Sequence, residues 1–386
     1  MEMEIKMKKL GFGTMRLPVL NQEDPASVDL EQVCKMVDTF MERGFTYFDT
    51  AYMYHKYESE RAVKKALVDR WPRDRYVLAD KLPLSHLKEE ADMERFFQEQ
   101  LEKCGVSYFD YYMLHNMSRA YYETAERLGA FAFVRGKKEE GKARRIGFSF
   151  HADAELLEEI LSKHPELDFV QLQLNYIDWD SPNIQSRQCY EVCRRYGKDV
   201  IVMEPVKGGT LADVPLEAEK LMEAHAPGMT PASWAVRFAA SREGVIMVLS
   251  GMSDYSQLLD NTAYMQDFVP LTEEEEGIVA RAAEIIQSAT AIACTSCQYC
   301  VEGCPKQIPI PKYFSLYNQY SLFGEKSNSR GYYLNYGGRY GKAGDCIGWG
   351  KAGASIACRR CEAICPQHLP IVQHMKEIAE VFEPAK

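Results

Sequence analysis

Eight short apolar runs, separated by longer stretches with helical periodicity, constrain this chain more than any other feature. The runs occupy residues 8–14, 46–51, 76–82, 108–115, 144–150, 169–176, 199–206 and 244–251. Between them lie segments such as DLEQVCKMVDTFMERG, in which apolar residues recur every three or four positions. Runs of this kind are typical of parallel strands that helices cover on the outside. The pattern predicts an α/β fold, a closed (β/α)8 barrel (TIM barrel), over residues 1–290.

A doubly wound open sheet is the competing interpretation of the same strand–helix alternation. That fold binds dinucleotides through a Gly-x-Gly-x-x-Gly sequence directly after its first strand. The corresponding segment here, LGFGTM at residues 10–15, lacks this spacing. The barrel is therefore favoured.

The cysteines divide the chain unevenly, because eight of the twelve lie within residues 294–365. The N-terminus, MEMEIKMKKLGFGT, lacks the apolar core of a secretory signal, so we expect a cytoplasmic protein with thiols rather than disulfides. A net charge of −10 argues against nucleic acid as a partner. No apolar stretch has the length of a membrane span, so we expect no membrane partner.

The segment CTSCQYCVEGCP contains the run Cys294-x2-Cys297-x2-Cys300-x3-Cys304-Pro, which binds iron–sulfur clusters in bacterial ferredoxins. Paired cysteines at this spacing also bind zinc. Four cysteines in one run followed by proline favour a [4Fe-4S] cluster over zinc. The fourth cysteine of such a run binds the other cluster in two-cluster ferredoxins, which assigns Cys304 to a second cluster.

A second run, Cys358-x2-Cys361-x3-Cys365-Pro, lacks its first cysteine, because Ser355 occupies that position. By the same exchange of fourth ligands, Cys365 belongs with the cysteines of the first run. Residues 291–386 are thus predicted to form a small, mainly α-helical ferredoxin-like domain that binds two [4Fe-4S] clusters.

The missing cysteine has an explanation in the preceding residues. GKAGDCIGW (341–349) and GKAGASIAC (350–358) look like a tandem duplication that aligns Cys346 with Ser355. We expect Cys346 to complete the second cluster across the glycine-rich loop between the two copies. The alternative is a cluster held by three thiolates, with one iron open to Ser355, water or substrate.

Polar residues follow three of the predicted barrel strands at their carboxyl ends, where barrel enzymes carry their active sites. They are Asp49, Lys81 and His115, and Tyr54 follows Asp49 by five residues. Each has an ordinary structural explanation alone, but together they are of the types that make one acid–base device. We expect the ammonium to lower the pKa of the tyrosine while the carboxylate keeps the lysine charged. The tyrosine then protonates a carbonyl oxygen, oriented by neutral histidine, as hydride reaches the carbon.

The segments FDTAYMYHKYESE, LADKLP and YYMLHN resemble the corresponding segments of the aldo-keto reductase family, and the resemblance covers about residues 8–290. It implies that Tyr54 is the general acid, that Lys81 and Asp49 adjust it, and that a small carbonyl or hydroxy compound is the substrate. IPIPKYFSLYNQY and CEAICPQHLPI are similar to the helical ferredoxin domain of one bacterial branch of that family.

The resemblance also implies a nicotinamide cofactor, NAD(P)H, across the barrel mouth. Ser149 and Gln171 resemble the family's contacts to the carboxamide, although Phe150 and Met203 differ from the residues common beside them. Near the adenosine phosphate the matching residues are Ser250, Gly251, Ser253 and Asn261. Gln257 stands where an arginine is expected, and a guanidinium is the usual partner of a 2′-phosphate. We therefore expect NADH rather than NADPH, or weak binding of nicotinamide altogether.

A nicotinamide exchanges two electrons as hydride, whereas a cluster exchanges one at a time. The leading prediction is an anaerobic oxidoreductase that reduces or forms a carbonyl at Tyr54 and exchanges electrons with a ferredoxin or flavodoxin through its clusters. A one-electron reduction of the carbonyl to a ketyl, leading to reductive elimination or dehydroxylation, is a second form of this prediction. Two alternatives remain: clusters that are purely structural in an ordinary NAD(P)H-dependent reductase, and an electron-transfer or sensing module with an inactive tetrad.

Overall fold

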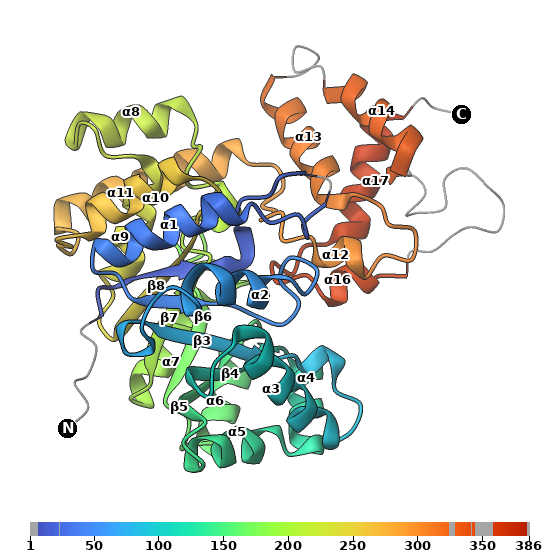
Figure 1. The fold of residues 1–386 in the computed structure, drawn as a ribbon. Helices are drawn as coiled ribbons and strands as arrows, with labels where there is room; N and C mark the ends of the chain where they lie inside the picture. Colours follow the sequence, from blue (N-terminus) through green and yellow to red (C-terminus); the bar gives the residue numbers. More distant parts are fainter. Residues whose placement is uncertain (1–6, 23, 324–328, 341, 344–357, 384–386) are drawn as a thin grey trace. The chain divides into compact units, whose positions relative to one another are not determined.

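The computed structural model describes residues 7–22, 24–323, 329–340, 342–343 and 358–383. Each predicted apolar run overlaps one strand of a closed, all-parallel barrel, although β4 ends two residues after its run and β5 begins one residue before its run (Figure 1). The strands are β1 Leu10–Gly13, β2 Tyr47–Asp49, β3 Val77–Leu82, β4 Phe109–Met117, β5 Ala143–Phe150, β6 Phe169–Gln173, β7 Asp199–Met203 and β8 Val245–Gly251. The barrel closes where Leu10 of β1 pairs with Val248 of β8, which confirms the predicted fold class.

Helices alternate with these strands. The helices from the first strand to the end of the barrel sequence are α1 Leu30–Glu42, α2 Ser59–Val63, α3 Ala91–Cys104, α4 Arg119–Leu128, α5 Ala130–Glu139, α6 Ala154–Lys163, α7 Ser186–Arg195, α8 Leu216–His225, α9 Pro231–Ala240 and α10 Tyr255–Met265. Short turns of 3-10 helix are η1 Thr14–Arg16, η3 Arg73–Arg75, η4 Leu84–His86 and η5 Lys207–Gly209, and η2 Lys64–Val68 is a π-helical turn. Several helices begin at side-chain caps, such as Asp29 before α1 and Asp153 before α6.

The barrel interior is filled by side chains that point inward from alternate strand positions. One buried cluster combines residues of β2, β3, β4, β6, β7 and β8, which is possible only inside the barrel: Tyr47, Val77, Ala79, Tyr111, Met113, Phe169, Ile201, Met247 and Leu249. Gly147 of β5 adds no side chain, because a Cβ there would lie 2.3 Å from the carbonyl oxygen of Phe169. The interior is therefore a packed core, and polar chemistry is confined to the strand ends.

The chain forms two compact units. The first comprises residues 1–206 and 228–277, and the second comprises residues 207–227 and 278–386. No sequence signal placed residues 207–227, which follow β7, in the second unit; the boundary at residue 290 stays a prediction. Among the helices that the structure describes, none has both the length and the apolar character needed to cross a membrane.

The second unit is mainly helical. Besides η5 and α8, it contains α12 Tyr299–Glu302, α13 Ile310–Phe323, α14 Ser329–Tyr340, α16 Arg360–Ala363 and α17 Ile371–Phe382, while α11 Glu273–Ala289 begins in the first unit. Thr272 caps α11, since its hydroxyl accepts from the Glu275 backbone and the Glu275 carboxylate accepts from the Thr272 backbone. A small core surrounds the buried cysteines Cys300 and Cys361 and the aromatic rings of Tyr313 and Tyr333.

The two cysteine runs have the same backbone. Residues with left-handed φ angles precede each short helix, at Gln298 (70°) and Arg359 (52°), and follow each proline, at Gln307 (52°) and His368 (50°). The longer helices α13 and α17 then begin at Ile310 and Ile371, six residues after Cys304 and Cys365 respectively. The second run is therefore a structural copy of the first over its described residues.

Candidate active site and cluster loops

The four predicted tetrad residues lie together at the carboxyl ends of β2, β3 and β4. The Nζ atom of Lys81 donates to Asp49 Oδ1 at 2.6 Å and to the carbonyl oxygen of Thr50 at 2.6 Å. Nζ lies 5.1 Å from the centroid of the Tyr54 ring, and the Tyr54 and His115 rings are 6.0 Å apart in an edge-on arrangement. Lys81 and Asp49 are buried, so the structure places a desolvated ion pair beside the tyrosine and histidine.

The pKa of Tyr54 differs from the sequence-based expectation. Burial raises it well above its ordinary value, and the negative charges of Asp49 and Glu204 raise it further. The expectation that Lys81 lowers this pKa was wrong for the structure as it stands, because the lysine is already paired with Asp49 while the phenol is buried. Tyr54 is therefore a neutral phenol that holds its proton.

His115 is also held neutral. Burial lowers its pKa well below the ordinary value, and the positive charge of Lys81 lowers it further. Among the described residues its Nδ1 atom has no hydrogen-bond partner. A neutral imidazole beside the phenol can orient a polar substrate atom without adding a second positive charge to the site.

Asp49 balances opposing effects. Burial raises the pKa of its carboxyl group, whereas the charge and hydrogen bond of Lys81 and a hydrogen bond from Gln171 lower it. The amide of Gln171 donates to Asp49 Oδ2 at 3.3 Å. Both carboxylate oxygens thus have donors, as a buried carboxylate requires.

A second polar network, which the sequence did not reveal, holds the backbone of Lys81 from outside the barrel. Strand β2 pairs with β3 only as far as Ala79, so the peptide groups of Lys81 need other partners on that edge. Its N–H donates to Asp80 Oδ1 at 2.8 Å, and its carbonyl accepts from Gln100 Nε2 at 3.0 Å. These two side chains fix the peptide from which the lysine side chain extends.

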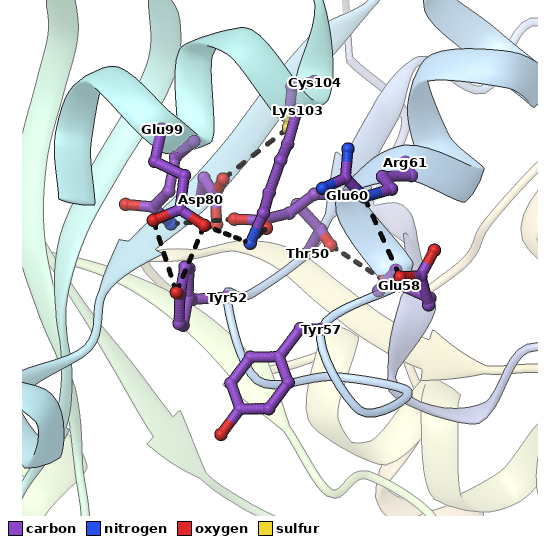
Figure 2. A network of polar contacts seen from close by, with 12 residues as sticks. Thr50, Tyr52, Tyr57, Glu58, Glu60, Arg61, Asp80, Glu99, Lys103 and Cys104 are labelled. Atoms are coloured by element: carbon purple, nitrogen blue, oxygen red, sulfur yellow. Dashed lines mark hydrogen bonds and ion pairs between the residues drawn. The ribbon is translucent and has the colours of Figure 1, made fainter. Parts of the chain in front are cut away.

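The same network contains a pair of buried acids, shown with their neighbours in Figure 2. Burial raises the pKa of Asp80 well above its ordinary value, and the charge of Glu60 and a hydrogen bond to Glu60 raise it further. Asp80 is therefore the protonated donor and Glu60 the acceptor. Lys103 lies 3.4 Å from Glu60 and 2.8 Å from Glu99, and the Cys104 thiol donates to Asp80. The alternation of strand side chains explains the pair: Lys81 points inward, so Asp80 must point outward.

The loop after Tyr54 has an unusual backbone that sequence reasoning also missed. His55, Lys56 and Tyr57 have φ angles of 51°, 51° and 74°, in the left-handed region that side chains other than glycine seldom adopt. The His55 ring anchors the loop, because Nε2 accepts from the Leu17 backbone at 3.1 Å and Nδ1 contacts the carbonyl oxygen of Pro25 at 2.7 Å. Strain of this kind persists where surrounding contacts hold the backbone, as they do directly beside Tyr54.

Among the predicted nicotinamide contacts, Ser149 and Ser250 lie near the carboxyl ends of their strands, whereas Gln171 is in the middle of β6. Ser149 is near the end of β5, where its hydroxyl accepts from the Asn116 backbone at 2.8 Å, and Gln171 on β6 bonds to Asp49. At the end of β8, Asn261 of α10 donates to Ser250 Oγ at 2.6 Å. The structure thus places Ser149 and Gln171 on neighbouring strands and joins Ser250 to Asn261 directly.

The turn after β8 contains the other two predicted contacts. Gly251 ends β8, and the backbone N–H of Ser253 donates to Gln257 Oε1 at 2.7 Å. The aliphatic part of Arg16, from η1, packs against Gly251, so that a Cβ at this glycine would lie 3.3 Å from it. Sequence reasoning missed this arginine because it follows the first strand rather than the last, and only barrel closure brings the two together.

The first cysteine run fits an iron–sulfur cluster. Burial raises the pKa of the Cys300 thiol, and the negative charges of Cys297, Cys294, Cys365 and Cys361 raise it further. Cys365 and Cys361 of the second run therefore both lie near Cys300, and the exchange of fourth ligands stays a prediction. Thiols whose pKa is raised by burial and by one another are stabilised as thiolates when iron binds them.

Backbone groups support the same ligands. The thiol of Cys294 accepts from the Ser296 backbone at 3.4 Å. Burial raises the pKa of Cys365, and backbone N–H groups of residues 367–369 oppose this by donating to the sulfur. Within the described ranges no three cysteine, histidine or acidic side chains surround a single metal ion, and a cubane does not need this, because each of its thiolates binds a different iron. Cys346 and Ser355 lie outside the described residues.

Comparison with known proteins identifies two domains in this chain. The model of the Aldo/keto reductase family matches residues 9–284, and a 4Fe-4S dicluster domain matches residues 293–369. An aldo-keto reductase from Mycobacterium avium is 24% identical over 250 residues, which cover 63% of this chain and 76% of the relative. A probable aldo-keto reductase from Glycine max is 26% identical over 212 residues, 53% of this chain and 57% of that protein's length.

Solved structures show the same fold. The holo form of an aldo-keto reductase from Bacillus halodurans has a TM-score of 0.57 at 23% identity, covering 71% of this chain and 91% of that one. An aldo-keto reductase from Klebsiella pneumoniae, solved in complex with NADPH, has a TM-score of 0.55 at 22% identity, covering 71% and 90%. With the family match over the barrel and the dicluster match after it, this chain belongs to the aldo/keto reductase family and carries a C-terminal 4Fe-4S dicluster domain.

Proposed function

We propose that this oxidoreductase reduces, or in reverse forms, a carbonyl group beside Tyr54. The observation that carries the proposal is the buried ion pair of Lys81 and Asp49, which lies next to the Tyr54 ring at the carboxyl ends of the barrel strands. The substrate class is a small carbonyl or hydroxy compound.

Tyr54 is the proton donor in this proposal. Its raised pKa keeps the phenol neutral until negative charge develops on the substrate oxygen, which then draws the proton from Oη. Neutral His115 orients that oxygen, and the Lys81 ammonium stabilises the phenolate left behind. Asp49 keeps the ammonium in place through its 2.6 Å hydrogen bond.

A bound nicotinamide would supply the hydride. Ser149 and Gln171 are the proposed contacts to its carboxamide, and Ser250, Gly251, Ser253 and Asn261 the proposed contacts to its adenosine end. The structure of a Klebsiella relative with NADPH supports nicotinamide binding in this fold. We propose NADH as the preferred form because Gln257, rather than an arginine, occupies the first turn of α10 after β8. Arg16 is a candidate contact to the diphosphate. Dissociation constants for NADH and NADPH test this preference.

The ligand sets follow from the two cysteine runs. Cys294, Cys297, Cys300 and Cys365 hold the first [4Fe-4S] cluster, and Cys304, Cys358, Cys361 and Cys346 hold the second. We propose that these clusters pass single electrons between a ferredoxin or flavodoxin and the oxidoreductase in a cytoplasmic, anaerobic setting. A structural role is the competing function, favoured by one observation: Cys300 and Cys361 are part of the small core of the second unit.

Replacement of Tyr54 by phenylalanine tests the proposed chemistry. We expect kcat for carbonyl reduction to fall by at least about a hundredfold, because the general acid is lost. The matched control is Tyr57→Phe in the same loop, whose side chain is 44% exposed and which we expect to keep full activity. Iron and sulfide contents should be unchanged in both. Equal activities for Tyr54→Phe and the wild type would refute the proposal.

Rapid-mixing spectra of the wild type separate the two roles of the clusters. Absorbance changes of the clusters at the rate of turnover support electron transfer, whereas clusters that never change oxidation state support the structural role. Cys346→Ala tests the displaced ligand: we expect the second cluster to lose iron or change its spectrum. A full complement of iron with an unchanged spectrum in this variant would instead favour the three-thiolate alternative.

A further inference from the structure

One lysine in the second unit has a place that the reductase chemistry does not explain. Lys207 follows β7 and belongs to the segment 207–227 of that unit. Its side chain is only 2% exposed. Lysine is seldom buried to this extent, because removing an ammonium group from water is unfavourable without a compensating partner.

The contacts of Lys207 lead to the first cysteine run. Its Nζ atom donates to Gln367 Oε1 at 3.0 Å, and Gln367 is itself buried, two residues after Cys365. Burial raises the pKa of the Cys294 thiol, and the positive charge of Lys207 acts on that thiol in the opposite direction. The Lys207 ammonium thus acts electrostatically on Cys294 and donates a hydrogen bond to Gln367, two residues after Cys365. Both cysteines are proposed ligands of the first cluster.

The backbone around Lys207 holds it in this place. Lys207 has a left-handed φ of 48°, and Gly208 follows with a φ of 66°. A Cβ at Gly208 would lie 2.2 Å from the carbonyl oxygen of Thr295, the residue after Cys294. Only glycine permits this close approach, so the η5 turn packs directly on the first cysteine loop and fixes the base of the lysine side chain.

The segment after β7 also contains a second charged residue, Glu204, three residues before Lys207. Glu204 acts electrostatically on Tyr54 in the first unit, and Lys207, three residues later in the sequence, acts on Cys294 in the second. One short segment after β7 therefore carries a charged residue of each site.

We propose that Lys207 sets the reduction potential of the cluster held by Cys294, Cys297, Cys300 and Cys365. Reduction adds one electron to the cluster and no proton, so negative charge increases beside a fixed ammonium. A nearby positive charge stabilises the reduced form more than the oxidised form, and the effect is large in a buried, weakly screened position. Gln367 is a positioning residue, because it holds the ammonium through its amide oxygen.

The test is a potentiometric titration of the holoprotein, followed by electron paramagnetic resonance, with iron and sulfide counts for each variant. Lys207→Met removes the charge and keeps the length of the side chain. We expect the equilibrium constant for one-electron reduction of one cluster to fall at least tenfold, a shift of about −59 mV in its midpoint potential, with a smaller shift for the other. Lys207→Arg keeps the charge and should stay within a few-fold of the wild type.

Gln367→Glu provides an independent arm if Lys207→Met fails to assemble its clusters. It leaves every cysteine and Lys207 in place but sets a carboxylate against the ammonium, so the same potential should fall. Lys376→Met is the matched control: this lysine lies on α17 of the same unit, its side chain is 53% exposed, and we expect no shift. Two unchanged potentials in fully loaded Lys207→Met or Gln367→Glu protein would overturn the proposal, as would equal shifts of both clusters.

This inference rests on the proposed ligand sets, and their failure is distinguishable from its own. If Cys294→Ala retains all iron, the ligand assignment is wrong whatever Lys207 does. If Cys294→Ala loses iron but the midpoint potential is the same with and without the Lys207 charge, the ligand assignment is supported and the proposed role of the lysine is wrong.

Discussion

The barrel unit and the helical unit organise their polar groups in opposite ways. In the barrel, the buried lysine at position 81 has its carboxylate partner and both of its peptide groups bonded by other side chains. In the helical unit, the buried thiol of Cys300 is surrounded by other thiols that disfavour its ionised form. The first site is completed by the chain itself, whereas the second is arranged for iron to complete.

The two units also differ in the secondary structure that carries their sites. The barrel has a continuous ladder of eight paired strands around a packed interior. In the helical unit, the helices that carry Cys300 and Cys361, α12 and α16, are four residues long. Helices this short are not stable by themselves, so the surrounding core and any bound cluster have to hold them in place.

The largest effect is expected when a proposed cluster ligand is removed from the helical unit, which tests whether this unit depends on its cluster while the barrel unit does not. Cys300→Ala should lose about half of the iron or more, because it removes one of four thiolates from a cluster. The helical unit should become sensitive to protease, while circular dichroism of the barrel persists. The matched control is Cys104→Ala, a buried cysteine of the barrel unit, which should retain all iron. Simultaneous loss of barrel structure in Cys300→Ala would show that the units do not differ in this way.

The next largest effect concerns the buried ion pair of Lys81 and Asp49 and the stability of the barrel unit. Lys81→Met leaves the Asp49 carboxyl group buried without its cation, and we expect the free energy of unfolding to fall by about 3 kcal/mol. Lys81→Met combined with Asp49→Asn should recover most of this stability but no activity. The control, Lys64→Met, breaks the half-exposed pair with Asp69 and should cost less than about 1 kcal/mol. Urea unfolding followed by tryptophan fluorescence provides the measurement, since three of the four tryptophans lie in the barrel unit. Similar losses for both single variants would contradict the difference in burial.

The smallest expected effect concerns the protonated acid behind Lys81. The folded chain keeps the proton of Asp80 above the ordinary aspartate pKa of about 3.9, at which the unfolded chain releases it. The folded state then binds more protons, so the free energy of unfolding falls as pH rises through that window, by up to about 1.4 kcal/mol per pH unit. Asp80→Asn imitates the protonated acid and should reduce this decline between pH 5 and pH 8.

Asp74→Asn, at an exposed position of η3, is the control for Asp80→Asn and should leave the slope unchanged. An Asp80→Asn slope equal to that of the wild type would mean that the carboxyl group is ionised in the folded protein. Glu60 and Asp49, whose pKa values burial also raises, should contribute to the slope that remains.

Much of the molecule could be predicted from the sequence because its signals are local. Apolar runs and helical periodicity identified all eight strands, and the spacing of cysteines identified the cluster loops, since both depend on residues close in the chain. The tetrad could be found because its members stand at strand ends, which a closed parallel barrel brings to one face. Cys346 stays a prediction, as it lies outside the described residues.

What only the tertiary structure decided depends on contacts between distant residues. The raised pKa of Tyr54 comes from burial and from the charges of Asp49, five residues away, and Glu204, 150 residues away along the chain. No local pattern contains the burial or the contribution of Glu204. The acid pair of Asp80 and Glu60 and the packing of Arg16 on Gly251 exist only once the strands are in register. Lys207 reads as an ordinary loop residue in the sequence, and folding alone buries its charge beside the first cysteine run, because a glycine turn packs on Thr295. Periodicity and spacing determine which elements form, but burial and charge proximity set how the sites behave, and those arise from the packed chain.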